Sequence, residues 1–508
     1  MKHRLAHEPI VWFYKNVLMP FLLNSHHNDS TRLRAIADAT GLPYKLCLES
    51  MLQPDALMLI SRLSVMKHFL RELPSSGLPG CTSAVALKQW TKGGKLLVCR
   101  NLDYPIVGPW EKQTTVVFNF PARASGEMPH VSVTSAGIPV AGLTAINVEG
   151  LTLAAHAHFG KDVSLRGRAI VNIGDEIISR ARTIGEAADI ARRYRRIGNW
   201  AFVISSAREH DAAVIEMSPT QTRVRHADDG FIAHTNLFQT DLRQREGLIS
   251  GGSYEDMVGR VCRIRQILER DRGSLEPKHL TAALGDHVDS ETGEERVVGN
   301  IISVVTTIAS IVLEPEGQRI WVSNRDESPT GIGNFLDVDL AKFWNTPSEE
   351  RLLPGYRPKC AALIQGAGLY REAYRAWHMN NHEPDFREKT LNALRRTLEI
   401  IPSDGYVWVQ AGIVAFSLRR FDESRQFLEQ AGQLRLSAHV AQVRDLFLAR
   451  CRDIAGDRQS AIALYRKYLT IADPKLRRAM KEGFRRRYRV SDTVRLMLDL
   501  QFADALQY

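Results

Sequence analysis

Hydrophobic and polar positions follow two different patterns along this chain, and the change falls near residue 350. Before it, short apolar or alternating runs predict β-strands. From about Arg351 onward, apolar positions recur with a helical period in segments rich in Arg, Leu and Ala. We therefore expect an α+β body followed by an all-helical region. The predicted strands cover residues 81–90, 96–100, 114–120, 131–136, 201–205, 212–217, 223–226, 301–311 and 319–323.

Helices are expected before the first strand. Residues 31–63 predict two helices that are separated by a break at Gly41-Leu42-Pro43. Residues 10–23 are apolar but interrupted by Lys15, too short to span a bilayer, and without a signal-peptide cleavage site. We interpret them as a helix packed on the body; a membrane-surface anchor is the alternative. Residues 186–196 predict a basic amphipathic helix within the body.

The C-terminal region contains two segments that resemble tetratricopeptide repeats, and residues 385–402 resemble half of an earlier one. Such repeats need small residues where their two helices approach closely, and stacked hairpins offer a concave face to a protein or peptide partner. The alternative is a plain helical appendage on the body. The matching positions are Trp408, Gly412, Phe421, Ser424, Leu428 and Ala431, and then Ala449, Gly456, Ala461 and Tyr465.

The length of 508 residues is too great for one ordinary core, so several domains are expected. We place them at residues 1–80, 81–345 and 346–508, with Pro347-Ser348 and Leu353-Pro354-Gly355 as the linker to the last. The six cysteines are scattered without a Cys-x-x-Cys pair or zinc-like spacing. This usage predicts neither a disulfide scaffold nor a metal site, and it favours a reducing cytoplasm.

Charge changes this picture only in part. The formal net charge is +10, and basic residues are concentrated in the runs 192–196 and 485–489. Solvated basic helix faces explain such runs, and no nucleic-acid module accompanies them, so no specific nucleic-acid partner is expected. The C-terminal run remains the better candidate for an acidic partner surface. A basic rim would also suit an anionic substrate, for example an acyl-thioester of coenzyme A.

The richest candidate chemistry lies at Gly80-Cys81, at the start of the first predicted strand. Cleavage of this bond would leave Cys81 with a thiol nucleophile and a free α-amine, whose reference pKa near ~8 suits a base. A hairpin through residues 92–95 would return Arg100 and Asp103 to Cys81, where the arginine favours a thiolate and the carboxylate orients the amine. The alternative is a buried structural cysteine beside a surface ion pair.

These residues resemble the penicillin acyltransferase-like branch of the N-terminal-nucleophile hydrolases, typified by isopenicillin-N acyltransferase. The resemblance covers roughly residues 30–335 and implies a four-layer αββα domain preceded by a helical pro-segment. It also implies self-cleavage at Gly80–Cys81. The motifs that carry it are Gly80-Cys81-Thr82, Arg100-Asn101-Leu102-Asp103-Tyr104, Asn147-Val148-Glu149-Gly150-Leu151, His234-Thr235-Asn236, and the strands 307–313 and 319–323 around a Glu-Pro-Glu-Gly turn.

The resemblance implies roles for individual residues. Cys81 would be nucleophile and base, Arg100 and Asp103 would tune and position it, and Asn236 would donate to an oxyanion. A turn residue is the alternative for Asn236. Tyr104, Asn147, His156 and His234 are candidate pocket residues, although His156 is more typical of a satisfied core histidine. The chain departs from the family at Leu237 and at Ala154, Ala155, His156 and His158, where relatives often carry histidine and asparagines respectively.

Two functions are compatible with this sequence. The first is a self-processing hydrolase or acyltransferase that forms an acyl-thioester on Cys81 and uses a small acyl amide or acyl thioester, with no cofactor and no metal. Its helical domain would recruit a protein partner. The second is a repeat-based interaction scaffold that carries a catalytically inactive domain. Nothing in the sequence distinguishes hydrolysis from transfer.

Overall fold

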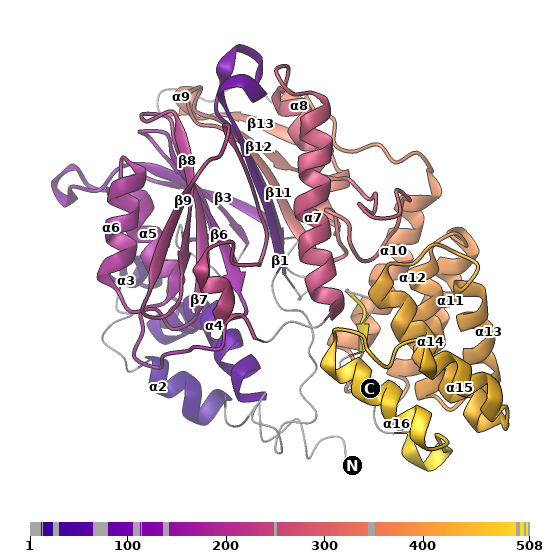
Figure 1. The fold of residues 1–508 in the computed structure, drawn as a ribbon. Helices are drawn as coiled ribbons and strands as arrows, with labels where there is room; N and C mark the ends of the chain where they lie inside the picture. Colours follow the sequence, from indigo (N-terminus) through magenta and orange to yellow (C-terminus); the bar gives the residue numbers. More distant parts are fainter. Residues whose placement is uncertain are drawn as a thin grey trace.

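A computed structural model describes residues 12, 14–23, 30–64, 80–104, 112, 114–135, 142–247, 251–343, 351–493, 498–501 and 504–505. Two seven-stranded antiparallel sheets form the centre of the body (Figure 1). The first has the order β10 (Phe231–His234), β1 (Gly80–Ala86), β2 (Leu97–Asp103), β11 (Thr307–Glu314), β12 (Arg319–Ser323), β13 (Phe335–Asp339) and β14 (Arg351–Leu353). The second has the order β3 (Thr114–Asn119), β4 (His130–Ser135), β5 (Thr144–Asn147), β6 (Leu151–His158), β7 (Asn199–Ser206), β8 (Asp211–Met217) and β9 (Thr222–His226).

The two sheets pack face to face and carry helices on their outer faces. Val85, Val98 and Ile311 of the first sheet meet Ile146 and Val203 of the second in one apolar core. Helices α7 (Gly251–Arg270) and α8 (Pro277–Leu284) cover the other face of the first sheet. The second sheet is covered by α4 (Tyr44–Ser64), α5 (Ile170–Arg180) and α6 (Ile184–Arg193). The prediction of two antiparallel sheets with helices is confirmed.

Some strand boundaries differ from the prediction. The first strand ends at Ala86 because the chain turns into a 3-10 helix at Lys88–Trp90, with Lys88 at a φ of 57°. Residues 301–306 are not a strand: after Asn300, at a φ of 49°, they form a buried loop that leads into β11. Within the two sheets, the sequence prediction also missed β5, β10, β13 and β14. Strand β14 extends the first sheet and includes Leu353, so the expected linker is wrong at this residue; Pro347-Ser348 lies outside the described residues.

The N-terminal helices follow their sequence signals. Helix α3 (Thr31–Thr40) begins at the Ser30 cap and ends at Gly41, whose φ of 70° suits glycine, and α4 follows at once. The break between two helices is therefore confirmed. A π-helical turn at Tyr14–Leu18 continues into α2 (Met19–Leu23), and Leu18, Met19 and Leu22 pack into the core around the second sheet. Within the described ranges, no helix is long and apolar enough to cross a membrane.

A buried carboxyl of α4 fastens this N-terminal segment to the body. Asp55 accepts hydrogen bonds from the Ile170 backbone N–H at the start of α5 (2.8 Å) and from the Trp200 indole N–H (2.8 Å). Burial raises the pKa of Asp55 to about 7, although both hydrogen bonds lower it. The folded chain therefore binds this proton more tightly than the unfolded chain does.

We expect the stability contributed by this contact to fall as pH rises. Between the ordinary pKa of 3.8 and the native value of about 7, the folded state holds more protons, so the free energy of unfolding decreases with pH. Thermal unfolding at pH 5 and pH 8 should show a larger loss of stability for wild type than for Asp55→Asn. Equal losses in the two proteins would contradict this role of Asp55.

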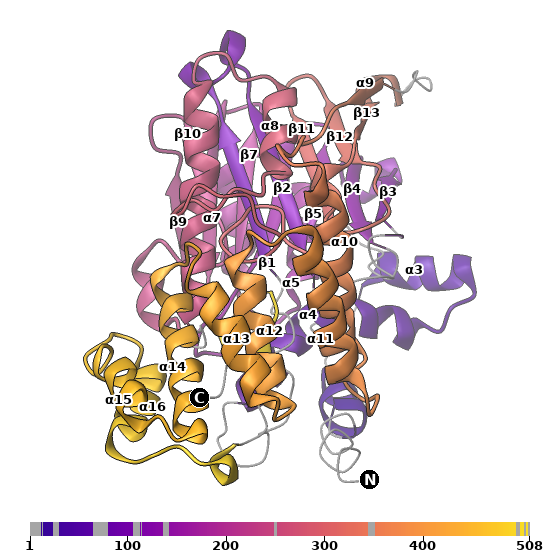
Figure 2. The ribbon, with the colours of Figure 1, turned by 90° about the vertical axis from the view of Figure 1, so that its right-hand side faces the viewer.

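The C-terminal helices stack as successive antiparallel pairs (Figure 2). Gly412 lies so close to Leu428 that a Cβ atom would come within 2.7 Å of its side chain, and Ser424 Oγ donates to the Gly412 carbonyl (2.7 Å). Small residues thus occur at the predicted close contact, while the assignment to tetratricopeptide repeats stays a prediction. The helices are α10 (Ala362–Tyr374), α11 (Phe386–Ile400), α12 (Gly405–Ser417), α13 (Phe421–Ala431), α14 (Ala438–Ala455), α15 (Arg458–Arg466) and α16 (Pro474–Arg485), and two short strands, β15 (Leu498–Asp499) and β16 (Asp504–Ala505), follow them.

Candidate active site

Cys81 lies near the start of β1, between β2 and β10 in the first sheet. The register pairs Gly80 with Asp103 and Ser83 with Arg100. Because side chains alternate between the faces of a sheet, Cys81 and Arg100 share the inner face and Asp103 lies on the helix-covered face. The cysteine is 2% exposed. Arg100 therefore lies on the same face of the sheet as the Cys81 thiol, and Asp103 lies on the opposite face.

Arg100 contacts the Cys81 thiol. Its Nη2 lies 3.4 Å from Cys81 Sγ, and its Nη1 donates to the Ala155 carbonyl (2.7 Å), which fixes the guanidinium between the sheets. Burial raises the pKa of the Cys81 thiol, and the nearby Arg100 charge opposes this effect. The arginine is thus placed to stabilise a thiolate when one forms.

Asn236 and Asp103 lie at the backbone of Cys81. The Cys81 N–H donates to Asn236 Oδ1 (2.9 Å), while Asn236 Nδ2 donates to the Ala157 carbonyl (2.9 Å). Asp103 Oδ1 accepts from the Thr307 hydroxyl (2.7 Å). A Cβ atom on Gly80 would lie 2.9 Å from Asp103 Oδ2, so this carboxylate lies against Gly80, and a larger residue there would have to displace it.

Asp103 is poised to titrate near neutrality. Burial raises its pKa to about 6, while the Arg260 charge and the Thr307 hydrogen bond lower it. The carboxylate is therefore ionised above this value, when it can orient an α-ammonium or accept its hydrogen bonds.

Arg260, a buried residue of α7, also contacts Cys81 and was not among the residues predicted from the sequence. Its Nη1 donates to the Cys81 carbonyl (2.8 Å) and the Thr82 hydroxyl (2.7 Å), and its Nη2 donates to Asn236 Oδ1 (3.3 Å). Nη1 also lies 3.8 Å from Asp103 Oδ2. The sequence offers only a weak indication of this role. Asp256 and Arg260 are four residues apart on one helix, a spacing that is common for surface ion pairs.

Three buried histidines lie on strands near β1: His156 and His158 on β6, and His234 on β10, which pairs with β1. His156 Nε2 is 2.8 Å from Ser83 Oγ and its Nδ1 is 3.0 Å from the Thr235 carbonyl oxygen. His158 Nε2 is 3.1 Å from His234 Nε2. Burial holds the pKa of His156 and of His234 well below the usual range, so both are neutral. Among the described residues, no cluster of histidine, cysteine and carboxylate side chains is arranged to hold a metal ion.

The other candidate pocket residues are buried, and the contacts of Asn147 are structural. Asn147 Nδ2 donates to the Ile178 and Ala181 carbonyls, and its Oδ1 accepts from the backbone after β5. These contacts shape the β5–β6 turn rather than the surroundings of Cys81. Tyr104 directly follows β2, and its N–H donates to the Thr306 carbonyl (2.8 Å).

Comparisons with known proteins agree with the motif pattern. Residues 90–328 match the family model described as acyl-coenzyme A:6-aminopenicillanic acid acyl-transferase, a range that includes Arg100, Asp103 and Asn236 and begins after Cys81. The comparison with curated proteins gave no match. Among solved structures, penicillin V acylase from Agrobacterium tumefaciens matches with 14% identity over 52% of this chain and 87% of that chain, with a TM-score of 0.34. That similarity is too low to support an argument.

Proposed function

Because residues 90–328 match the family model described as acyl-coenzyme A:6-aminopenicillanic acid acyl-transferase, we propose that this chain is a self-processing N-terminal-nucleophile enzyme that transfers or hydrolyses acyl groups. Cys81 is its nucleophile. The substrate class is a small acyl amide or acyl thioester, and the family description makes an acyl-coenzyme A a reasonable donor. One observation above all supports the proposal. Three different buried side chains contact Cys81: Arg100 contacts its thiol, Asn236 its backbone nitrogen and Arg260 its carbonyl oxygen.

Maturation begins with attack of the Cys81 thiol on the carbonyl carbon of Gly80. The Gly80–Cys81 C–N bond breaks as a thioester forms, and the proton lost by the thiol ends on the new α-amine. Water then hydrolyses the thioester, which leaves the Gly80 carboxylate and regenerates the thiol. Asn236 already accepts from the nitrogen that becomes the amine, and Asp103 lies beside the scissile bond.

Turnover repeats this chemistry on a substrate. The thiol attacks the acyl carbonyl, and Arg100 favours its thiolate form. The α-amine takes the thiol proton and delivers it to the leaving amine or thiol. Water or an acceptor amine then attacks the acyl-thioester, with the α-amine acting again as base, and free Cys81 returns.

Intact mass and N-terminal sequencing of purified wild-type protein test the proposal. We expect a fragment that begins at Cys81, together with its N-terminal counterpart ending at Gly80. A single uncleaved chain under native conditions would refute the free-amine mechanism and favour the interaction scaffold.

Two substitutions of Asn236 distinguish its role as acceptor for the Cys81 backbone N–H from its proposed role as oxyanion donor. We expect Asn236→Ala to slow cleavage and acyl transfer by about 10²–10³-fold, as for loss of an oxyanion donor. Asn236→Asp keeps an acceptor for the Cys81 nitrogen but lacks the N–H donor. Single-turnover rates should therefore fall in both variants if the amide stabilises an oxyanion. An unaffected Asn236→Ala protein would exclude both roles.

A further inference from the structure

The second turn of α7 joins the active-site cluster to the C-terminal helices. At its inner side, Asp256 Oδ2 accepts from Arg260 Nε (2.8 Å), so it holds the guanidinium that contacts Cys81 and Asn236. The next residue toward the N-terminus, Glu255, faces the helical region instead. It accepts from the Ser437 hydroxyl (2.7 Å) and from the His439 backbone N–H (3.0 Å) at the start of α14.

A second link runs through the loop between α8 and β11. The Asn300 backbone N–H donates to Asp256 Oδ1 (3.0 Å), and Asn300 Nδ2 donates to the Tyr406 hydroxyl of α12 (3.3 Å). The same hydroxyl donates to Asp289 (3.3 Å) and accepts from the Ser437 N–H (3.3 Å). Both carboxylate oxygens of Asp256 therefore accept hydrogen bonds, one from Arg260 and one from the loop that contacts α12. We call the hydrogen-bonded pair Asp256 and Arg260 the Asp256–Arg260 arm.

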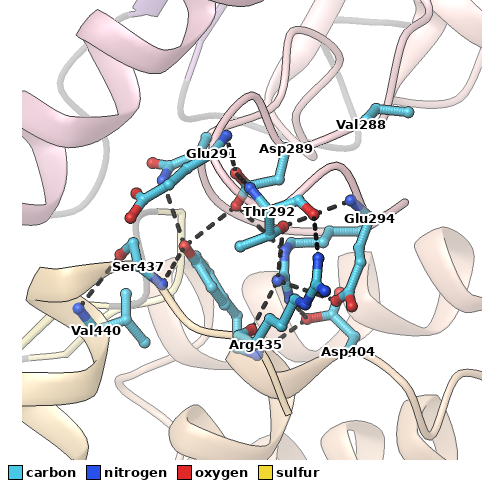
Figure 3. A network of polar contacts seen from close by, with 12 residues as sticks. Val288, Asp289, Glu291, Thr292, Glu294, Asp404, Arg435, Ser437 and Val440 are labelled. Carbon is cyan, nitrogen blue, oxygen red and sulfur yellow. Dashed lines mark hydrogen bonds and ion pairs between the residues drawn. The ribbon is translucent and has the colours of Figure 1, made fainter.

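The loop itself is held by a buried polar network against the helical region (Figure 3). Arg296 lies 4.4 Å from the centre of the Tyr406 ring, donates to the Arg435 carbonyl (2.8 Å) and is 3.2 Å from Asp289. Asp404 accepts from the Val297 N–H (2.9 Å). Buried charges of this kind are costly to leave unpaired, so the network strongly disfavours separation of the two regions.

We propose that the C-terminal helical region is a structural part of the active site, because it fixes the Asp256–Arg260 arm that positions Cys81 and Asn236. This inference rests on the proposed function of Cys81. It assigns a positioning role to Arg260 and a supporting role to Tyr406 and Ser437. The helical region then acts on the chemistry of the cysteine whether or not it also binds a partner.

The position of Arg260 can be tested without a substrate, because its positive charge affects the ionisation of the Cys81 thiol. Arg260 and Arg100 are the two cations that lower the pKa of the buried Cys81 thiol. If the Arg260 guanidinium moves away from Cys81, the pKa of the thiol should rise. Iodoacetamide labelling of Cys81, followed by peptide mass at a series of pH values, reports the midpoint of this ionisation separately from labelling of the other cysteines.

The test compares Tyr406→Phe with Tyr356→Phe. Each removes one hydroxyl between the body and the C-terminal part, but the Tyr356 hydroxyl contacts Glu295 rather than Asn300. We expect Arg260→Met to raise the labelling midpoint by about one pH unit, with Arg260→Lys in between. Tyr406→Phe and Ser437→Ala should raise it less, and Tyr356→Phe should keep the wild-type value. Acyl-transfer rates, where measurable, should fall in the same order with kcat more affected than KM.

Two results would overturn the inference. One is a midpoint in Tyr406→Phe and Ser437→Ala that equals that of Tyr356→Phe. The other is an unshifted midpoint in Arg260→Met. Absence of processing in wild type would instead count against the proposed function alone, since the labelling comparison still decides how the arm is held. A wild-type circular dichroism spectrum and a single cooperative melting transition in every variant serve as the folding control, since the Ser437 hydroxyl also caps α14 and its loss lowers the melting temperature.

Discussion

Replacement of Cys81 by alanine is expected to leave the chain whole and to abolish acyl transfer. The variant lacks the sulfur that would attack Gly80 in the precursor and the substrate carbonyl in the mature enzyme. Losses of about 10⁶-fold are typical when a covalent nucleophile is removed, so residual turnover should be undetectable. Intact mass and a single-turnover acyl-transfer assay measure the two effects on one preparation.

Cys99→Ala is the matched control. Cys99 is another buried cysteine, on the adjacent strand β2, but it pairs with Ala84 and packs toward α7 and α8 on the opposite face. This variant should be cleaved and should turn over substrate at close to the wild-type rate. Cleavage of Cys81→Ala at the same bond would show that another group, or an external protease, performs the reaction.

Asp103→Asn is expected to slow processing and turnover by about 100-fold or more above pH 7, because the asparagine cannot supply the negative charge that orients an α-ammonium. Asparagine preserves the size of the side chain and an acceptor for the Thr307 hydroxyl. The loss would therefore reflect charge rather than packing.

The pH dependence of the rate gives the sharper measurement. Burial raises the pKa of Asp103 to about 6, so the carboxylate is protonated below this value and ionised above it. Wild-type activity should then rise with pH through about 6. Asp103→Asn should lack this limb and keep only the one that belongs to the α-amine, near ~8. A limb at about 6 that survives in the variant would assign it to another group.

Local signals in the sequence were sufficient for much of the fold and for part of the site. Alternating apolar runs predicted most strands, since burial of one face of a sheet imposes that period. Gly41 predicted the helix break because its left-handed conformation suits glycine. The glycine turn after Lys92 predicted the hairpin that brings Arg100 to Cys81, a contact set by the register of two adjacent strands.

Contacts between distant elements could not be predicted in this way. Arg260 resembles any helical arginine with an acidic residue four positions before it, and only the packing of α7 on β1 directs it to Cys81. The same holds for Tyr406, whose hydroxyl meets Asn300 across the junction with the helical region. The sequence alone determined most of the secondary-structure pattern and the hairpin, because these depend on neighbours along the chain. The tertiary structure decided which buried charges surround the cysteine, because these depend on how separate elements pack.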